Sequence, residues 1–254
     1  MRIVDADTHI SSDLHGNRIS AEDHIEQMDK NEICCSLIWL HPNQQENEYC
    51  DFEAQNRYIY ESSKKYSGRF LPVGWINPKV YGMNQIKEQI LRQTLEYGFC
   101  GIKMNGAQNF YDLLDPQISL PAIEEIAKHN VFLAFHSGND TYTHPDKVAY
   151  IAGLYPEIPI LLVHVGQTAC SAAIEAAKQC SNIFLVGSGM PDISPVLTAY
   201  ETIGAERICF GSDTPFFDIR KTIDTYNSLF ENNISEDDLN SIMGANILHL
   251  FNRD

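Results

Sequence analysis

The chain has 254 residues, and its 44% hydrophobic content is enough for one large core, so we expect a single domain over 1–254. Its 34 acidic residues outnumber its 18 basic residues, which gives a formal net charge of −16 at pH 7. Nucleic acids and anionic membrane surfaces attract clustered Lys and Arg, so this charge argues against both as partners. A small-molecule substrate is the partner that we expect.

The cysteines bear on the cellular compartment. The seven cysteines form no Cys-x-x-Cys pair, and most of them lie in apolar runs. Neither a disulfide framework nor a structural zinc ribbon is therefore expected. No apolar signal region follows Met1, and no run approaches the roughly 20 apolar residues of a membrane span. These features predict a cytoplasmic protein without a membrane segment.

Strand-like apolar runs recur along the whole chain, at 2–6, 34–40, 70–76, 99–104, 131–136, 159–164, 182–187 and 207–212. Segments with helical signals follow them, at 21–31, 52–66, 83–97, 118–130, 145–154, 168–180, 191–204 and 217–232, and a last helix is expected at 235–251. Eight strand–helix units in a chain of this length predict an α/β fold, a (β/α)8 TIM barrel with a C-terminal extra helix. A doubly wound open sheet is the less favoured alternative.

Ionisable residues stand at or just beyond the ends of four of these runs. They are Asp7 and His9 after the first run, His136 and His164 at the ends of the fifth and sixth, and Asp213 after the eighth. Parallel α/β folds place their active sites at the carboxyl ends of strands, where these side chains would meet. Desolvating such a cluster without a partner is costly, so the pattern predicts a metal site.

Each of these residues also has a simpler interpretation. A lone histidine after an apolar run is usually a hydrogen-bonded core residue, and Asp213 before Pro215 is suited to cap a helix. Strand alternation places Asp5, Asp7 and His9 on one face, where Asp7 and His9 alone would form a hydrogen-bonded pair as readily as a metal site. The recurrence of such residues at several strand ends favours the metal.

Longer motifs accompany these residues. They are Arg69-Phe70-Leu71-Pro72-Val73-Gly74 with Asn77-Pro78, Gly101-Ile102-Lys103-Met104-Asn105 with the segment 110–116, Phe210-Gly211-Ser212-Asp213-Thr214-Pro215, and Gly244-Ala245-Asn246 with Leu250-Phe251. Together they resemble the amidohydrolase superfamily, specifically its amidohydrolase-related (amidohydrolase 2) branch of TIM-barrel enzymes. That branch includes decarboxylases and hydratases as well as hydrolases. The resemblance covers nearly the whole chain.

The resemblance implies a role for each strand-end residue. Asp7, His9, His136 and Asp213 would be metal ligands, and His164 would be either a ligand or an acid/base group. Asp213 and His164 would be the catalytic residues, and Zn²⁺ is the expected ion, with Mn²⁺ as the alternative. Most of the family has histidine where this chain has Asp7. A carboxylate there reduces the Lewis acidity of the ion and suits Mn²⁺ better than an all-imidazole site does. Relatives with an acidic first ligand include decarboxylases.

Three residues are candidates for substrate binding. In some branches of the superfamily a lysine at the position of Lys103 is carboxylated and bridges two metals. A plain Lys103 that binds a substrate carboxylate, or one paired with an acid, are the alternatives. Asn105 shares the face of Lys103 if the strand continues. Trp39, with His41, is placed to line the pocket, and the alternative for His41-Pro42 is that it opens the following loop.

Long loops and further histidines lie outside these strand ends. The longest loops are expected at 10–19, 41–51 and 105–116, and the last, rich in Asn and Gln, is suited to close over a modest polar substrate. Five further histidines fall in expected loops or helices, where exposure or capping would explain them: His15, His24, His129, His144 and His249.

Three functions follow from these observations. The favoured one is a metal-dependent hydrolase that uses an activated water on an amide, lactone or related carbonyl bond. A metal-dependent non-oxidative decarboxylase on the same scaffold is the alternative that the acidic first ligand suggests. A barrel that binds metal without catalysis is the third. Barrels of this family commonly pair through outer helices, so a homodimer is also expected.

Overall fold

The computed structural model describes residues 1–41, 52–80, 82–231 and 233–251, so most of the loop expected at 41–51 lies outside the described residues. Its strands are β1 (Ile3–Ile10), β2 (Ile33–Leu40), β3 (Phe70–Pro72), β4 (Gly74–Trp75), β5 (Gly101–Met104), β6 (Phe132–His136), β7 (Ile160–Val163), β8 (Ile183–Gly187) and β9 (Ile208–Phe210). The strand expected at 70–76 is divided at Val73 into β3 and β4. The other strands agree with the expected runs to within a few residues.

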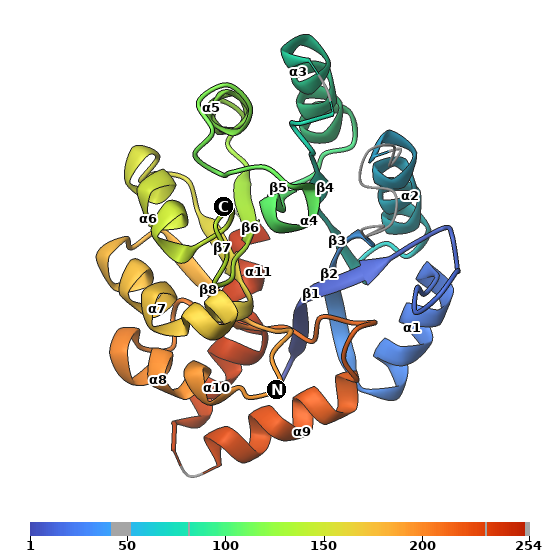
Figure 1. Cartoon of the computed structure of the whole chain (residues 1–254). Coiled ribbons are helices and arrows are strands. Elements are labelled where there is room, and N and C mark those ends of the chain that lie inside the picture. Colours follow the sequence, from blue (N-terminus) through green and yellow to red (C-terminus); the bar gives the residue numbers. More distant parts are fainter. Residues whose placement is uncertain (42–51, 81, 232, 252–254) are drawn as a thin grey trace.

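The strands pair in parallel and in sequence order around a ring (Figure 1). The Val73 amide donates to the Ile38 carbonyl and so joins the two halves of the divided strand to β2. The ring closes between β1 and the segment after β9, where Thr8 bridges Thr214 and the His9 amide donates to the Thr214 carbonyl over 2.7 Å. The predicted TIM barrel is confirmed.

Helices surround the barrel on all sides in Figure 1. They are α1 (Ala21–Lys30), α2 (Phe52–Lys65), α3 (Met83–Leu91), the short α4 (Gly106–Asn109), α5 (Ser119–Ala127), α6 (Pro145–Leu154), α7 (Cys170–Gln179), α8 (Ser194–Ile203) and α9 (Ile219–Phe230). A π-helical turn, Arg92–Glu96, extends α3, and a 3₁₀ segment, His164–Ala169, precedes α7. Ser20 starts α1 with a capping box, in which it and Asp23 satisfy each other's backbone amides.

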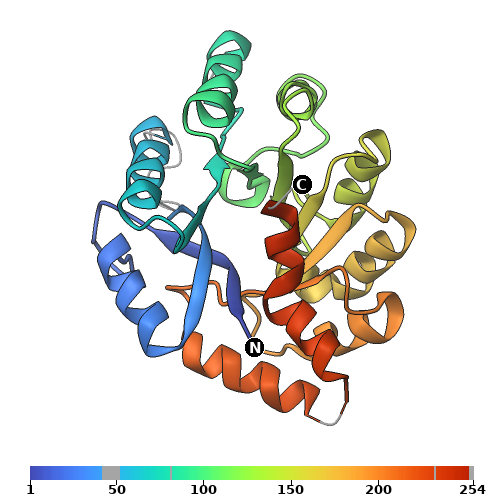
Figure 2. The same ribbon diagram turned by 180° about the vertical axis from the view of Figure 1, so that it is seen from behind.

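The C-terminal segment closes the end of the barrel where the strands begin. It runs through α10 (Glu236–Asn240), a π-helical turn (Ser241–Ala245) and α11 (Asn246–Phe251), and Figure 2 shows it across the barrel opening. A Cβ at Gly244 would lie 2.3 Å from the Arg2 carbonyl oxygen, so only glycine permits this approach to β1. The Phe251 ring packs edge-on against Phe132 at the start of β6. The predicted extra helix therefore leaves the opposite end of the barrel free for a site.

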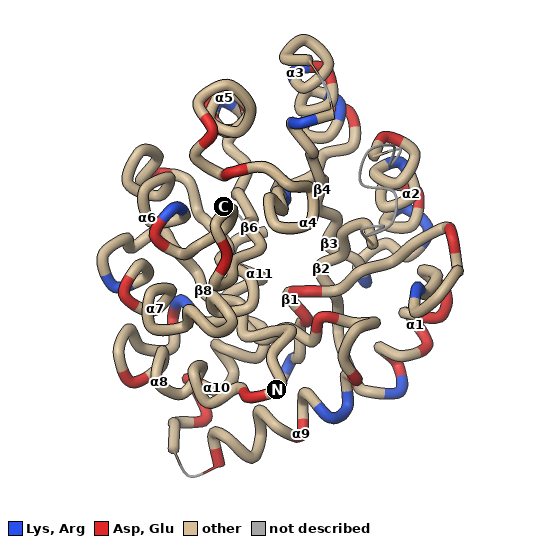
Figure 3. Tube along the Cα trace, in the orientation of Figure 1, with Lys and Arg blue, Asp and Glu red and all other residues tan. Residues whose placement is uncertain are grey.

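The charged residues lie mainly on the outer helices, as Figure 3 shows, while the strand side chains form an apolar interior. This distribution is typical of a barrel whose helices separate the sheet from water. Among the described residues, no helix is both long and apolar enough to cross a membrane.

His24 contradicts the expectation that exposure or capping explains the remaining histidines. It is fully buried, its ring stacks on Phe70 with centroids 5.9 Å apart, and neither ring nitrogen has a hydrogen-bond partner among the described residues. Burial, with a smaller effect from the Arg69 charge, lowers the pKa of His24 to about 3. His144 does cap α6, as expected.

Replacing His24 with leucine is expected to make the protein less sensitive to acid. Between pH 6.5 and the folded pKa of about 3, the unfolded chain binds a proton that the folded protein does not, so stability falls as the pH falls. Removing this group should lessen the dependence of the unfolding free energy on pH by about 1.4 kcal/mol per unit below pH 6.5. Urea unfolding at several pH values measures this. The exposed His15, changed to glutamine, is the control, and an unchanged slope in His24→Leu would contradict the expectation.

Candidate metal centre

A cavity of about 230 Å³ opens at the carboxyl ends of the strands, opposite the C-terminal helix. It is lined by His9, Lys103, Asn105, Gln108, His136, His164, Gln167, Gly189, Asp213, Phe216 and Phe217. Six of these are site residues predicted from the sequence: His9, Lys103, Asn105, His136, His164 and Asp213. Residues far apart in the sequence are thus brought to one place by the closed barrel.

β1 carries Asp7 and His9 but separates them from Asp5. The strand continues to Ile10, beyond its expected end, and its register against β2 shifts by one residue between Asp5 and Thr8. Asp5 accepts hydrogen bonds from the amides of Ser212, over 2.8 Å, and Asp7, over 3.2 Å. Burial raises the pKa of Asp5 to about 7 despite these bonds. Asp5 therefore joins β1 to the segment after β9.

The hydrogen bonds of His9 identify its tautomer. Nδ1 lies 2.8 Å from the Leu40 carbonyl oxygen, which only accepts, so Nδ1 carries the proton. The Trp39 indole N–H donates to Nε2 over 3.2 Å, which agrees with an unprotonated Nε2. Burial, with the Lys103 charge, lowers the pKa of His9 to about 3. The ring is therefore neutral. Its Nε2 atom lies 3.4 Å from Asp213 Oδ1 and 3.7 Å from Asp7 Oδ1.

Asp213 completes this group from the segment after β9. Its backbone adopts a left-handed conformation, with φ of 61°, which is uncommon for a residue other than glycine and is found at functional sites. The Asp213 amide donates to the Asp7 carbonyl over 2.8 Å, which keeps the two carboxylates adjacent. Burial and the neighbouring Asp7 charge raise the pKa of Asp213 to about 7.

The donor set of Asp7, His9 and Asp213 suits a divalent cation. One ligand atom from each residue lies within 4.8 Å of the others, and all three residues are buried. Asp7 Oδ1 is buried and has no hydrogen-bond partner among the described residues. Two neighbouring buried carboxylates repel each other, and a cation bound between them would relieve this repulsion. Oxygen and imidazole donors together fit Mn²⁺ or Zn²⁺.

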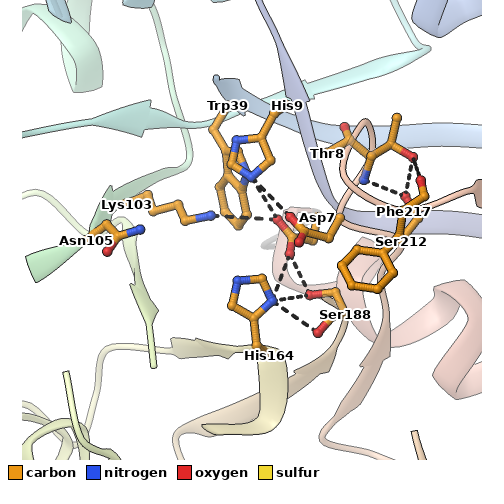
Figure 4. A network of polar contacts seen from close by, with 12 residues as sticks. Asp7, Thr8, His9, Trp39, Lys103, Asn105, His164, Ser188, Ser212 and Phe217 are labelled. Carbon is orange, nitrogen blue, oxygen red and sulfur yellow. Dashed lines mark hydrogen bonds and ion pairs between the residues drawn. The ribbon is translucent and has the colours of Figure 1, made fainter. Parts of the chain in front are cut away.

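Lys103 lies beside this group and is also buried (Figure 4). Its Nζ is 3.7 Å from Asp7 Oδ1, 3.4 Å from the centroid of the Trp39 ring and 5.0 Å from that of Trp75. Burial lowers the pKa of Lys103 to about 8, although Asp7 and Asp213 oppose the change. Trp39 is fully buried behind His9 and Lys103 and is not among the residues that line the cavity.

His136 and His164 stand on the other side of the cavity. Their rings meet edge to face with centroids 4.9 Å apart, and His136 lies outside the group formed by Asp7, His9 and Asp213. Burial, with the nearby His164 and Lys103, lowers the pKa of His136 well below its ordinary value. His164 Nδ1 is 3.7 Å from Asp7 Oδ2. Their assignment as a metal ligand and an acid/base group stays a prediction.

The expected substrate loop at 105–116 contributes two polar residues to the cavity. Asn105 caps α4 by accepting from the Gln108 amide, and its side-chain amide donates to Gln108 Oε1 over 2.6 Å. These carboxamides face the cavity beside Lys103. They offer neutral hydrogen-bonding groups to a ligand.

Sequence reasoning missed Ser188 and Gly189, which follow β8. The Ser188 hydroxyl donates to Asp7 Oδ2 over 2.5 Å and lies 3.1 Å from His164 Nδ1 (Figure 4). Gly189 lines the cavity with a left-handed φ of 63°. The only signal in the sequence was their position, because they follow a predicted strand but carry no ionisable group.

Replacing Gly189 with alanine is expected to disrupt the site. A Cβ there would lie 2.4 Å from His164 Nδ1 and 2.7 Å from Asp213 Oδ2, so both side chains must move. We expect the affinity for Mn²⁺, measured by calorimetry, to fall about 10–100-fold, as it does when groups that orient ligands are altered. The control is Gly153→Ala in α6, where a Cβ meets nothing within 4 Å. Equal Mn²⁺ affinity in the two variants would contradict this expectation.

A family model described as "Amidohydrolase" matches residues 40–253. No protein in the curated set matches the sequence at a significant level. Solved structures match over nearly the full length of both chains, at identities that show a shared fold.

Three of these structures illustrate the similarity. The 5-carboxyvanillate decarboxylase LigW of Sphingomonas paucimobilis is 15% identical with a TM-score of 0.77, and 98% of each chain is covered. A dihydroxybenzoic acid decarboxylase of a Polaromonas species, with bound manganese and 2-nitroresorcinol, is 18% identical with a TM-score of 0.75, over 98% of this chain and 96% of that one. The probable 2-pyrone-4,6-dicarboxylic acid hydrolase of Acinetobacter baumannii is 13% identical with a TM-score of 0.69, over 99% of each chain.

Proposed function

The chain belongs to the amidohydrolase family, and from this premise we propose that it is a metal-dependent decarboxylase of a small carboxylic acid. The observation that carries the proposal is the buried group of Asp7, His9 and Asp213, whose ligand atoms lie within 4.8 Å of one another. The acidic first ligand, Asp7, supports decarboxylation over the hydrolysis that the sequence analysis favoured. Two of the structural neighbours described above are decarboxylases, and one of them binds manganese.

The ligand set supports Mn²⁺ as the resident ion. Two carboxylates and one imidazole form an oxygen-rich set, which suits Mn²⁺ better than an all-imidazole set would. The Zn²⁺ expected from the sequence analysis is the alternative. When bound, the ion would supply positive charge that holds the substrate's oxygen atoms and stabilises the negative charge that develops as carbon dioxide leaves.

Asp213 is the group placed to move a proton. In the metal-free protein its pKa is raised to about 7, so this carboxyl group can exchange a proton near neutral pH. Oδ1 faces His9, whereas Oδ2 lies toward Gly189 at the cavity wall. As the bond to the carboxylate carbon breaks, its electron pair stays on the substrate carbon, which takes the proton from Asp213. Solvent then returns a proton to Asp213. His164, which lies beside Asp7 and lines the same cavity, would orient the substrate.

Hydrolysis is the second candidate, and Asp213 again supports it. A carboxylate with a pKa of about 7 is also suited to accept a proton from an attacking water. The Acinetobacter baumannii neighbour is described as a hydrolase of a pyrone. The two reactions use the same residues and differ in whether carbon dioxide is released.

Product analysis separates these functions. Chelator-treated protein would be supplied with Mn²⁺ or Zn²⁺ and offered 5-carboxyvanillate, 2,6-dihydroxybenzoate and simple pyrones or lactones. Mn²⁺-dependent release of carbon dioxide, lost in Asp213→Asn, would support the proposal. Ring opening without carbon dioxide would favour the hydrolase. Tight ion binding without turnover of any compound in a broader panel of carboxylic acids and lactones would favour the barrel that binds metal without catalysis.

A further inference from the structure

The carboxyl end of β8 is the part of the barrel rim whose role neither the sequence motifs nor the proposed reaction explains. We infer that Ser188 is a positioning residue, which holds Asp7 as a one-oxygen ligand and accepts the Nδ1 proton of His164. The inference rests on the proposed metal site for its Asp7 part. Its His164 part rests on the hydrogen bonds of the protein alone.

The Ser188 hydroxyl has a single proton to donate. Ser188 is buried, and its Oγ lies 2.5 Å from Asp7 Oδ2, a carboxylate oxygen that only accepts when ionised. The hydroxyl therefore donates to Asp7, and its only proton lies between these two oxygen atoms.

His164 contacts both oxygen atoms of Ser188. Its Nδ1 lies 3.1 Å from Ser188 Oγ and 3.1 Å from the Ser188 carbonyl oxygen. The carbonyl only accepts, and the hydroxyl has already donated its proton to Asp7. Nδ1 must therefore be the donor to both. In the neutral ring this leaves Nε2 unprotonated, as a base or a ligand at the cavity that His164 lines.

The two carboxylate oxygens of Asp7 have different surroundings. Because Oδ2 is occupied by the Ser188 hydroxyl, Oδ1 is the oxygen left for the cation, and Oδ1 is the buried atom without a hydrogen-bond partner among the described residues. An aspartate has a second oxygen that a histidine ligand lacks, and an unsatisfied buried oxygen is costly. Ser188 supplies that oxygen with a donor. Figure 4 shows Ser188 between Asp7 and His164, connected to both.

Two measurements test the inference in Ser188→Ala. Nitrogen-15 NMR of histidine-labelled, metal-free protein reports the tautomer of His164, whose signals are assigned by their loss in His164→Gln. Calorimetry with Mn²⁺ reports the dissociation constant. We expect the wild-type ring to carry a proton on Nδ1. Ser188→Ala keeps the backbone carbonyl that accepts this proton but loses the hydroxyl acceptor, so its Nδ1 chemical shift should change. We also expect the dissociation constant to rise about 10–100-fold.

Two further variants keep the test decisive. Ser188→Cys has nearly the same size but is a weak donor, so it should show the same direction of change if the alanine variant fails to fold. Ser36→Ala removes an equally buried serine on β2 whose hydroxyl has no hydrogen-bond partner among the described residues, and should change neither measurement.

Each half of the inference has its own contrary result. A wild-type ring without a proton on Nδ1, or an Nδ1 chemical shift that is unchanged in the Ser188 variants, would overturn the His164 part. An unchanged dissociation constant would overturn the Asp7 part. If the wild-type protein takes up no Mn²⁺ or Zn²⁺, the proposed function and the Asp7 part both fail, while the NMR result in metal-free protein still decides the His164 part.

Discussion

Turnover is expected to fall about 10²–10⁴-fold when Asp213 is replaced with asparagine, which is the range that a proton-transferring group contributes. Asparagine keeps the size of the side chain and an oxygen that can face His9, but it cannot carry a proton. The pKa of about 7 for Asp213, caused by burial and the Asp7 charge, is the feature that this change removes. The measurement is kcat for the substrate identified above, at saturating metal.

The control for this prediction is Asp218→Asn. Asp218 caps α9 at the surface by accepting from the Lys221 amide, and asparagine is an equally good cap. Its turnover should equal that of the wild type. A kcat in Asp213→Asn within a fewfold of the wild-type value would show that Asp213 does not move the proton, even if it binds the metal.

The second large effect is expected on stability, in Lys103→Met. The metal-free protein should lose about 3–5 kcal/mol of unfolding free energy, because removing one member of a buried ion pair leaves the other charge unpaired. Lys103 and Asp7 are both buried, and their charged groups lie 3.7 Å apart. Methionine keeps an unbranched side chain of nearly the same length, so lost packing contributes little. The contacts of Nζ with the Trp39 and Trp75 rings are lost together with the ion pair. Urea unfolding in the presence of a chelator measures the loss.

Added metal distinguishes the charge effect from a packing defect. A cation bound to Asp7 would replace the missing ammonium charge, so Mn²⁺ should restore part of the stability of Lys103→Met. The exposed Lys178→Met is the control and should leave stability nearly unchanged, since its ion pair with Glu175 lies in water. A loss below about 1 kcal/mol in Lys103→Met, judged against the range for buried pairs, would contradict the assignment of Lys103 as the counter-ion of Asp7.

The alternation of apolar runs and helical segments was sufficient to predict the barrel, because each unit must bury one face of a strand and one face of a helix. The strand bounds were less predictable. β1 continues through Asp7 and His9 to Ile10, because β2 and the Thr214 segment supply hydrogen bonds on both sides of it. Such partners come from distant parts of the chain and leave no local signal.

The candidate site was predictable where its residues are ionisable. Asp7, His9 and Asp213 stand out after apolar runs, and the barrel brings them together. Asp5 shares their sequence pattern but is separated from them by the register shift in β1, which alternation alone does not reveal. Ser188 was missed because an uncharged serine after a strand is common, and its importance comes from what lies beside it.

The burial of His24 could have been predicted from helical periodicity. This residue follows Ala21 by three residues and precedes Met28 by four, so helical periodicity places it on the buried face of α1 with both of them. Its polarity suggested exposure instead. In this case the position of the residue in the helix was the better guide.

The central claim is that Asp7, His9 and Asp213 hold one divalent ion. The most direct test is calorimetric titration of Mn²⁺ and Zn²⁺ into chelator-treated wild-type protein and into His9→Ala. The account predicts one ion per chain in the wild type and loss of that binding in the variant. Wild-type protein that takes up neither ion, or a His9→Ala variant that binds as tightly as the wild type, would contradict it.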